Sequence, residues 1–354
     1  MTPPTPALEI DLAQVDRNCT AVARYAAAHG LAWRPHVKTH KSSRIATRQL
    51  AAGASGLTCA TLREAEVMAT VCDDLLLAYP PVDDDRARRA ADLATQVRLG
   101  VMLDSLASAE RLSVALVAVG ATARVLVEVD AGMRRTGVAG EAEAVALARA
   151  VTALPGLAFD GFGFYPGHVR TAGSEVDAEL ARLSAFVLAL RAAADAAGLE
   201  VRTISCGSTP LLWRSHEIAG ITEIRAGTAV YFDRTSVLGG VATWEDCAAH
   251  VMATVVSTAV PGQAVVDAGV KAIGREPLRG GAGEGFACVA GRPEVPVVRL
   301  SEEHGVLDLS QTDWRPVLGE VVRLIPNHIC VAVHCFDVMM CSDGEVERVE
   351  ARGR

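Results

Sequence analysis

Short β-type runs alternate with Ala-rich amphipathic stretches from about residue 10 to about residue 235. This alternation is typical of repeated βα units, in which helices connect the strands of a parallel sheet. Eight candidate strands are centred on Trp33–Lys38, Gly56–Ala60, Asp74–Tyr79, Gln96–Met102, Arg124–Val129, Ala158–Phe164, Val201–Cys206 and Ile221–Arg225. Helical patterns between them include Leu62–Val71, Asp83–Ala94, Ala142–Ala153 and Glu175–Ala197. Eight such units predict a closed (β/α)8 TIM-type barrel.

The pattern changes after about Ser236, where strand-like runs are joined by Gly- and Pro-rich connections and helical runs are few. These runs are Cys247–Val256, Gln263–Val266, Val295–Leu300, Gly305–Leu309, Glu320–Leu324 and Ile329–Val333. A chain of 354 residues, half of them hydrophobic, can bury one large core and a smaller one. We therefore expect an α/β protein with a barrel over residues 10–235 and a smaller β-rich domain over residues 236–354, which residues 1–9 join.

The composition excludes several classes of protein. The formal net charge is −8 and no block of Lys or Arg persists, so we expect neither nucleic acid nor an anionic membrane as a partner. The first residues lack a basic region followed by an apolar run, and no apolar stretch is long enough to span a bilayer. Nine cysteines without framework spacing indicate reduced thiols. We expect a soluble cytoplasmic protein.

Lys38 is a candidate Schiff-base lysine. It lies in the segment RPHVKTHK, residues 34–41, where a short apolar stretch ends and helical sequence begins. A lysine at the carboxyl end of the first barrel strand faces the ring of loops in which barrel enzymes react, and partial desolvation there makes the amine more nucleophilic. The other interpretation of this segment is a solvated basic turn.

Other strand ends carry polar or glycine-rich loops. The sixth strand ends in a loop with Tyr165 and His168, which could supply a hydrogen-bond donor and a general base, or form only a structural aromatic with an exposed histidine. Small residues follow the seventh and eighth strands, where a barrel binds phosphate through N–H groups and hydroxyls. The predicted cofactor-binding residues there are Gly207, Ser208, Thr209, Gly227, Thr228 and Tyr231.

His328 and Cys330 form a candidate metal site. Two residues that are two apart on an extended strand point to the same side, so both could reach one ion. An imidazole with a thiolate suits zinc, and two protein ligands leave positions for water or substrate. The alternative is a buried core cysteine beside a surface histidine. His334 and Cys335, which follow closely, could be unrelated to such a site.

In their order along the chain, these motifs resemble the fold-type III pyridoxal phosphate enzymes, and most closely their D-serine dehydratase and D-threonine aldolase branch. The resemblance covers nearly the whole chain. It implies that Lys38 holds pyridoxal 5'-phosphate and that Arg135, in the segment EVDAGMRRTG, approaches the phenolic oxygen of this cofactor. Dehydratases of this branch carry His-X-Cys at the position of His328 and Cys330, whereas aldolases usually carry His-X-Asp. The roles of Arg225, Glu303 and His304 stay open.

The resemblance implies a lyase that uses pyridoxal phosphate and a divalent metal, with zinc favoured and manganese as the alternative, and that acts on D-β-hydroxy amino acids. We favour a D-serine dehydratase type that yields a 2-oxo acid and ammonia over retro-aldol cleavage to glycine and an aldehyde, in which His168 could be the base. An amino acid racemase is disfavoured because no tyrosine follows Tyr231. A non-catalytic cofactor carrier would lack the β domain. A homodimer is also expected from the family.

Overall fold

The computed structural model describes residues 4–169, 174–278 and 284–353. Contacts between Cα atoms divide the chain into two compact units. The barrel unit contains Thr20–Lys38 and Ser43–Gly227, and the β unit contains the residues before Thr20 together with Thr39–Ser42 and Thr228–Arg352. Helix α1 (Leu12–Ala28) begins in the β unit and ends in the barrel unit. The domain division expected at residue 235 stays a prediction.

The barrel unit is built on an eight-stranded sheet in which all neighbours are parallel, in the order β2-β9-β8-β7-β6-β5-β4-β3. Its strands are β2 (Ala32–Trp33), β3 (Leu57–Cys59), β4 (Asp74–Leu77), β5 (Arg98–Leu103), β6 (Ala123–Glu128), β7 (Leu157–Gly163), β8 (Thr203–Cys206) and β9 (Glu223–Ile224). A parallel bridge between His36 and Thr58 joins the two ends of the order. The sheet is therefore closed, as the eight-unit pattern predicted.

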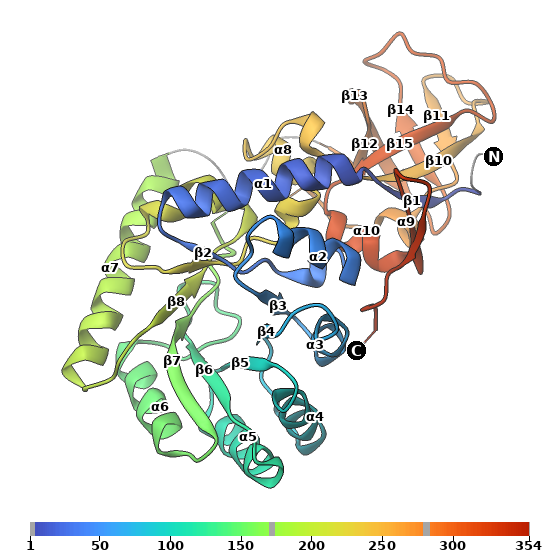
Figure 1. The fold of residues 1–354 in the computed structure, drawn as a ribbon. Coiled ribbons are helices and arrows are strands. Elements are labelled where there is room, and N and C mark those ends of the chain that lie inside the picture. The colour runs from blue at the N-terminus through green and yellow to red at the C-terminus, as the bar shows by residue number, and fades with distance from the viewer. Residues whose placement is uncertain (1–3, 170–173, 279–283, 354) are drawn as a thin grey trace. The chain divides into compact units, whose positions relative to one another are not determined.

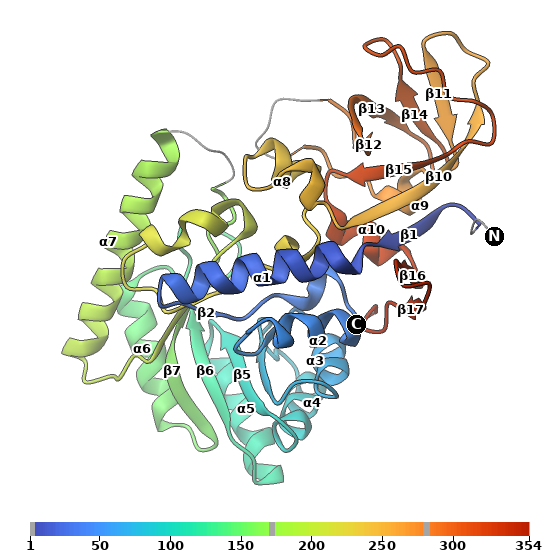
Figure 2. The ribbon, with the colours of Figure 1, turned by 45° about the horizontal axis from the view of Figure 1, so that its top comes forward.

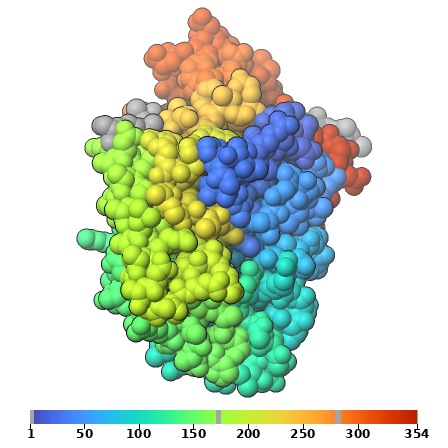
Figure 3. Space-filling model, turned by 60° about the vertical axis from the view of Figure 1, so that its left-hand side comes forward, coloured from blue at the N-terminus to red at the C-terminus, as the bar shows by residue number. Residues whose placement is uncertain are grey.

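Helices alternate with the strands and surround the sheet (Figure 1). They are α2 (Ser43–Ala51), α3 (Leu62–Met68), α4 (Asp84–Ala94), α5 (Leu106–Val119), α6 (Glu141–Ala153) and α7 (Ser174–Ala196), with the 3₁₀ helix η2 (Thr209–Glu217) after β8. Local signals set several ends: Asp83 caps α4 by accepting from Arg86 N, and Gly120 ends α5 with φ of 67°. In Figure 3 the blue segment of α1 lies against the yellow segment of η2, where the Tyr25 hydroxyl is 2.8 Å from His216 Nδ1.

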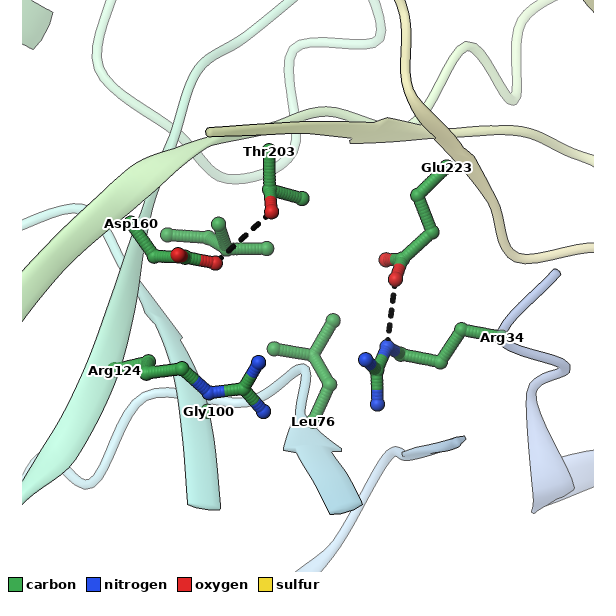
Figure 4. Close-up of a pocket in the computed structure, with 8 residues that line it drawn as sticks. Arg34, Leu76, Gly100, Arg124, Asp160, Thr203 and Glu223 are labelled. Carbon is green, nitrogen blue, oxygen red and sulfur yellow. Dashed lines mark hydrogen bonds and ion pairs between the residues drawn. The ribbon is translucent and has the colours of Figure 1, made fainter. Parts of the chain in front are cut away.

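A charged cluster fills the barrel near the amino ends of its strands. Arg34 contacts Glu223 and Asp74 at 2.7 Å each, and Arg124 contacts Asp74 at 2.6 Å. Figure 4 shows Arg34, Arg124 and Glu223 around a pocket that Asp160 and Thr203 also line. Burial alone would raise the pKa of Asp74, but the two guanidinium groups hold it below its usual value. Since barrel enzymes react at the opposite, carboxyl ends of their strands, we assign this cluster to stability.

The β unit contains a nine-stranded sheet in the order β11-β14-β13-β12-β15-β10-β1-β16-β17. Its strands are β1 (Ala7–Ile10), β10 (Ala249–Ser257), β11 (Gln263–Val266), β12 (Ala287–Val289), β13 (Arg292–Leu300), β14 (Gly305–Asp308), β15 (Val321–Pro326), β16 (Val338–Cys341) and β17 (Val346–Arg348). All neighbours are antiparallel except β1 and β16. A further pairing of β10 with β11 closes the first six strands into a barrel, which Figure 2 shows from a second side.

The expected strand at Ile329–Val333 is wrong, because these residues begin helix α10 (Ile329–Cys335). Ile329, Ala332 and Val333 are the buried residues of this helix, and their spacing of three and four places them on one helical face. Burial of this face overrides the strand preference of the β-branched residues. The short helices α8 (Arg234–Leu238) and α9 (Val270–Ile273) also lie in this unit.

In the described parts of the chain, no helix is both long and apolar enough to cross a membrane.

Candidate active site

Lys38 lies in the 3₁₀ turn η1 (Val37–Thr39), a few residues after the end of β2. Its Nζ atom is 5.7 Å from the centre of the Tyr165 ring, and Cζ of Arg135 is 5.1 Å from the same centre. Three of the predicted residues, from the ends of β2, β6 and β7, are thus brought together at the carboxyl side of the sheet. Two cations beside one ring make this rim attractive to an anionic cofactor.

The loop that carries Arg135 is held by hydrogen bonds from its backbone N–H groups to two aspartate side chains. The carboxylate of Asp130 accepts from the N–H groups of Gly132 and Arg134, and Asp104 accepts from Gly137 N at 2.9 Å. A side chain at Gly137, where φ is 103°, would meet the backbone of Asp130. These contacts fix the loop while the Arg135 side chain stays exposed.

Glu128, at the end of β6, is a functional candidate that sequence analysis missed. Its carboxylate accepts from the Thr136 hydroxyl at 2.7 Å. Burial raises the pKa of this carboxyl, which that hydrogen bond partly opposes. A lone glutamate at a strand end carried no signal in the sequence.

The loop after β7 places Tyr165 near Lys38 and Arg135, but it places His168 beside Glu179. A Cβ atom at Gly167 would overlap the Tyr165 ring, so glycine is required there. His168 Nε2 lies 2.6 Å from Glu179 Oε1, on α7, and the imidazole also lies beside Gly132. Arg182 donates to the same Glu179 oxygen at 2.5 Å and lowers the pKa of that carboxyl. Sequence analysis missed Glu179 because α7 is otherwise an ordinary charged helix.

Ser208 shows the clearest sign of an anion site. Its hydroxyl is buried, with 3% of the residue exposed, and has no hydrogen-bond partner within the described structure. It precedes η2, whose first N–H groups include that of Thr209, and Gly207 before it has φ of 113°. A buried hydroxyl without a partner costs about 1–3 kcal/mol, which a phosphate oxygen would offset. These three residues therefore fit a phosphate group.

Gly227 passes close to the chain near Lys38. A Cβ atom there would lie 2.5 Å from the backbone oxygen of His36. Thr228, which follows, belongs to the β unit and has its hydroxyl 3.5 Å from Cys330 Sγ. Thr228 thus contacts the metal motif, and its expected role with phosphate stays a prediction.

Two further residues of the eighth strand end are held inside the protein. Arg225 is fully buried, donates to Ser205 Oγ at 2.5 Å and to the Phe164 carbonyl at 2.9 Å, and has a pKa lowered by burial. Tyr231 has no exposed surface, and its hydroxyl lies 3.9 Å from the thioether of Met339. Its expected role in cofactor binding stays a prediction.

His328 and Cys330 lie at the start of α10, not on a strand. His328 is the N-cap residue, and Cys330 Sγ donates to Thr39 Oγ1 at 3.2 Å. Electrostatic interaction with Cys330 raises the pKa of His328, against the opposing effect of burial, and Asp233 adds to the rise. Among the described residues, no group of three or more His, Cys, Asp or Glu has a metal-binding arrangement. An imidazole and a thiol nevertheless fit a borderline divalent ion with two protein ligands.

The remaining candidates lie elsewhere. Glu303 and His304 are exposed in the hairpin turn between β13 and β14, where Glu303 pairs with Lys271 at 2.6 Å. Cys335, at the end of α10, contacts the carbonyl of Val331. These contacts give Glu303 and Cys335 structural partners.

A closed barrel with a lysine after its first strand and small-residue loops after its seventh and eighth strands is the arrangement expected of a barrel enzyme that binds a phosphate-bearing cofactor. Residues 10–235 match "Alanine racemase, N-terminal domain" and residues 248–342 match "Putative serine dehydratase domain". The chain belongs to the family of pyridoxal phosphate dependent lyases that combines these two domains.

Characterised relatives match over nearly the whole chain. A D-threonine aldolase from Arthrobacter sp. is 33% identical, over 99% of this chain and 93% of its own length. A D-threo-3-hydroxyaspartate dehydratase from Delftia sp. (strain HT23) is 34% identical, over 99% and 97%. The crystal structure of D-threonine aldolase from Filomicrobium marinum superposes with a TM-score of 0.91, at 33% identity over 99% of this chain and 96% of that one.

Solved variants of D-threo-3-hydroxyaspartate dehydratase replace a histidine and a cysteine that are two residues apart. The cysteine variant is described as being in the metal-free form; it has a TM-score of 0.87 and 32% identity, over 98% of this chain and 97% of that one.

Proposed function

We propose that this protein is a lyase that uses pyridoxal phosphate and a divalent metal to remove water from D-β-hydroxy amino acids, in the manner of D-serine dehydratase. The observation that carries the proposal is the pairing of His328 with Cys330 in a chain whose barrel brings Lys38, Arg135 and Tyr165 together. The similar dehydratase with a histidine and a cysteine at the same spacing supports it.

Different residues of the chain would bind the cofactor and transfer the proton. Lys38 would hold the cofactor, and its amine would take the proton from the substrate's α-carbon. Arg135 stabilises negative charge on the cofactor ring oxygen. Gly207, Ser208 and Thr209 bind the phosphate with N–H and hydroxyl donors, which fixes the cofactor against the lysine. The bound cofactor supplies an electron sink for the α-carbanion charge.

His328 and Cys330 would hold the metal, favoured as zinc, which supplies a Lewis acid at the β-hydroxyl. Thr39 and Thr228, whose hydroxyls lie near Cys330, directly follow Lys38 and Gly227 in the chain. Loss of the hydroxyl together with the α-proton removes one molecule of water from the substrate. Hydrolysis of the resulting unsaturated amino acid then gives a 2-oxo acid and ammonia. We also propose a homodimer in the cytoplasm, as the family resemblance implies.

Retro-aldol cleavage is the second candidate. The 33% identity to a D-threonine aldolase favours it, and His168 held by Glu179 would be a base for the β-hydroxyl proton. The bond from the α-carbon to the β-carbon would then break to release glycine and an aldehyde. The racemase alternative has no comparable support, since the relatives at this identity are lyases.

Product analysis tests the choice. The purified protein is incubated with D-serine, D-threonine and both 3-hydroxyaspartate diastereomers, with and without added zinc or manganese, and ammonia, 2-oxo acid and glycine are measured. We expect ammonia and a 2-oxo acid in equal amounts with zinc. If glycine dominates with D-threonine, the dehydratase assignment is wrong and the aldolase replaces it.

A further inference from the structure

Asp233 is a buried carboxylate that the proposed reaction does not yet use. Its side chain is 2% exposed and it precedes helix α8. The residue before it, Phe232, has φ of 48°, in the left-handed region that residues other than glycine rarely occupy. Such backbone strain persists where the surroundings fix one conformation, often at a functional site. The direction of the Asp233 side chain is therefore set by the fold.

The two oxygens of Asp233 have different partners. Oδ1 accepts from Ser236 N at 2.9 Å and from Ser236 Oγ at 2.6 Å, which caps α8. Oδ2 faces the start of α10: it accepts from Ile329 N at 3.3 Å and lies 3.4 Å from His328 Nδ1. One oxygen thus anchors the carboxylate, and the other is directed at the imidazole.

The imidazole of His328 is the side chain that faces Oδ2 of this carboxylate. Of the Lys and Arg residues in the described structure, none forms an ion pair with Asp233. The neighbouring Arg234 directs Nη1 to the Glu284 carbonyl and to Asn327 Oδ1 instead. A buried carboxylate is stable only with hydrogen-bond donors or a cation, and His328 completes this set.

We propose that Asp233 is a positioning residue for the metal ligand His328, an inference that rests on the proposed metal-dependent function. A carboxylate at Nδ1 keeps the proton on that nitrogen, fixes the plane of the ring and leaves Nε2 with a lone pair for a metal. Asp233 also accepts from Ile329 N, so it sets the position of the helix start on which His328 and Cys330 lie. Sequence separates Asp233 from His328 by about ninety residues, and only the folded β unit joins them.

The test uses the full-length holoenzyme and compares Asp233→Ser with Asp233→Asn. Serine can still cap α8 but cannot reach the imidazole, whereas asparagine keeps an oxygen for Nδ1–H without the charge. Affinities for Zn²⁺ and Co²⁺ are measured by chelator competition, and the Co²⁺ absorption spectrum reports the ligand geometry. We expect Asp233→Ser to weaken Co²⁺ binding by about 10- to 100-fold and to change the spectrum, and Asp233→Asn to weaken it less.

Three controls separate the explanations. Asp83→Ser alters the similar cap of α4 in the barrel unit and should leave metal binding unchanged. Cofactor absorbance and thermal unfolding show whether Asp233→Ser keeps the fold. If Asp233→Ser does not fold, the Co²⁺ spectrum of Asp233→Asn tests the role of Asp233 instead. Wild-type affinity and an unaltered Co²⁺ spectrum in the folded variants would overturn the role of Asp233. If His328→Ala also keeps the metal, the proposed metal site itself is wrong. If His328→Ala loses the metal and the Asp233 variants keep it normally, only the role of Asp233 is wrong.

Discussion

At the scale of single residues, the site is organised around the Tyr165 ring, within cation–π distance of both Lys38 and Arg135. The neutral Tyr165 ring does not neutralise the charges of Lys38 and Arg135. An anionic cofactor and a substrate carboxylate can therefore balance these charges. The arrangement favours Lys38 over other lysines as the residue that carries the cofactor. Lys271, for example, is exposed and paired with Glu303.

Replacing Lys38 with alanine should abolish turnover and remove the near-visible absorbance that a covalently held cofactor gives. The reason is that Lys38 lies near the Tyr165 ring, as Arg135 does, whereas Lys271 is exposed and paired with Glu303. Absorbance spectra and ammonia release are the measurements, and Lys271→Ala is the matched control, with unchanged spectra and rate. Borohydride trapping of the cofactor on a different lysine in the Lys38 variant would contradict the assignment.

Glu179→Gln should reduce any release of glycine from D-threonine by about 10-fold, which is less than the roughly 10²–10⁴-fold contribution of a general base because His168 itself remains. Glutamine weakens the 2.6 Å contact that orients the His168 imidazole. Ammonia release from D-serine should fall by less, because Lys38 and the metal carry that reaction. Glu175→Gln, on an exposed part of the same helix, is the control. Equal losses in both products would place His168 in a step common to both reactions.

At the scale of elements, strand ends and helix starts supply the polar groups. Ser208 precedes η2, and His328 precedes α10, so both lie where backbone N–H groups have no partner within the helix. The phosphate and the metal motif therefore use the same kind of position in two different units. The cluster of Asp74, Arg34 and Arg124 instead occupies the amino ends of the barrel strands and holds the sheet together.

Ser208→Ala should weaken cofactor binding by about 10-fold, because a hydrogen bond to a charged group contributes roughly 1.5–3 kcal/mol. The cofactor-free protein should be as stable as the wild type or more so, since the substitution removes a buried hydroxyl without a partner. Cofactor titration and thermal unfolding of the cofactor-free protein measure the two effects. A loss of stability without a loss of affinity would show that the hydroxyl serves the fold.

Asp74→Asn should lower the free energy of unfolding by about 3 kcal/mol at pH 7, because it breaks a buried ion pair. The pKa of Asp74 is lowered in the folded protein, so this stabilisation is present above the unfolded pKa of about 3.9 and is lost as pH falls through the folded value. The difference from wild type should thus shrink below about pH 4. Denaturant titrations at several pH values measure it, with the exposed neighbour Asp73→Asn as control. A difference that is independent of pH would exclude the ion pair as its cause.

At the scale of the whole molecule, the chain passes from the barrel unit to the β unit directly after Lys38 and again directly after Gly227. Of the residues predicted to bind the cofactor, all except Thr228 and Tyr231 belong to the barrel unit, and the proposed metal motif with Asp233 belongs to the β unit. Binding of the two groups therefore depends on separate sets of residues. The proposed reaction requires both.

Chelation should remove activity and leave the cofactor bound, because no barrel-unit residue is expected to hold the metal. Activity should return with zinc, and His328→Ala should resemble the chelated wild type in rate and absorbance. Dialysis against a chelator, metal analysis and absorbance spectra provide the measurements. Full activity after complete removal of metal would leave His328 and Cys330 as structural residues and would remove the basis for the dehydratase assignment.

The sequence by itself determined the closed eight-stranded barrel, because alternating apolar and amphipathic runs are local patterns that the backbone geometry follows directly. It also predicted Lys38 and the small residues around Ser208 as site residues, since they follow apolar runs that read as strands. Tertiary structure decided that residues 329–335 form a helix, because burial of one helical face outweighed the preference of β-branched residues. It also joined Asp233 to His328 and Glu179 to His168, and buried Tyr231 in the core. Contacts between residues far apart in the chain depend on packing, for which no local pattern exists.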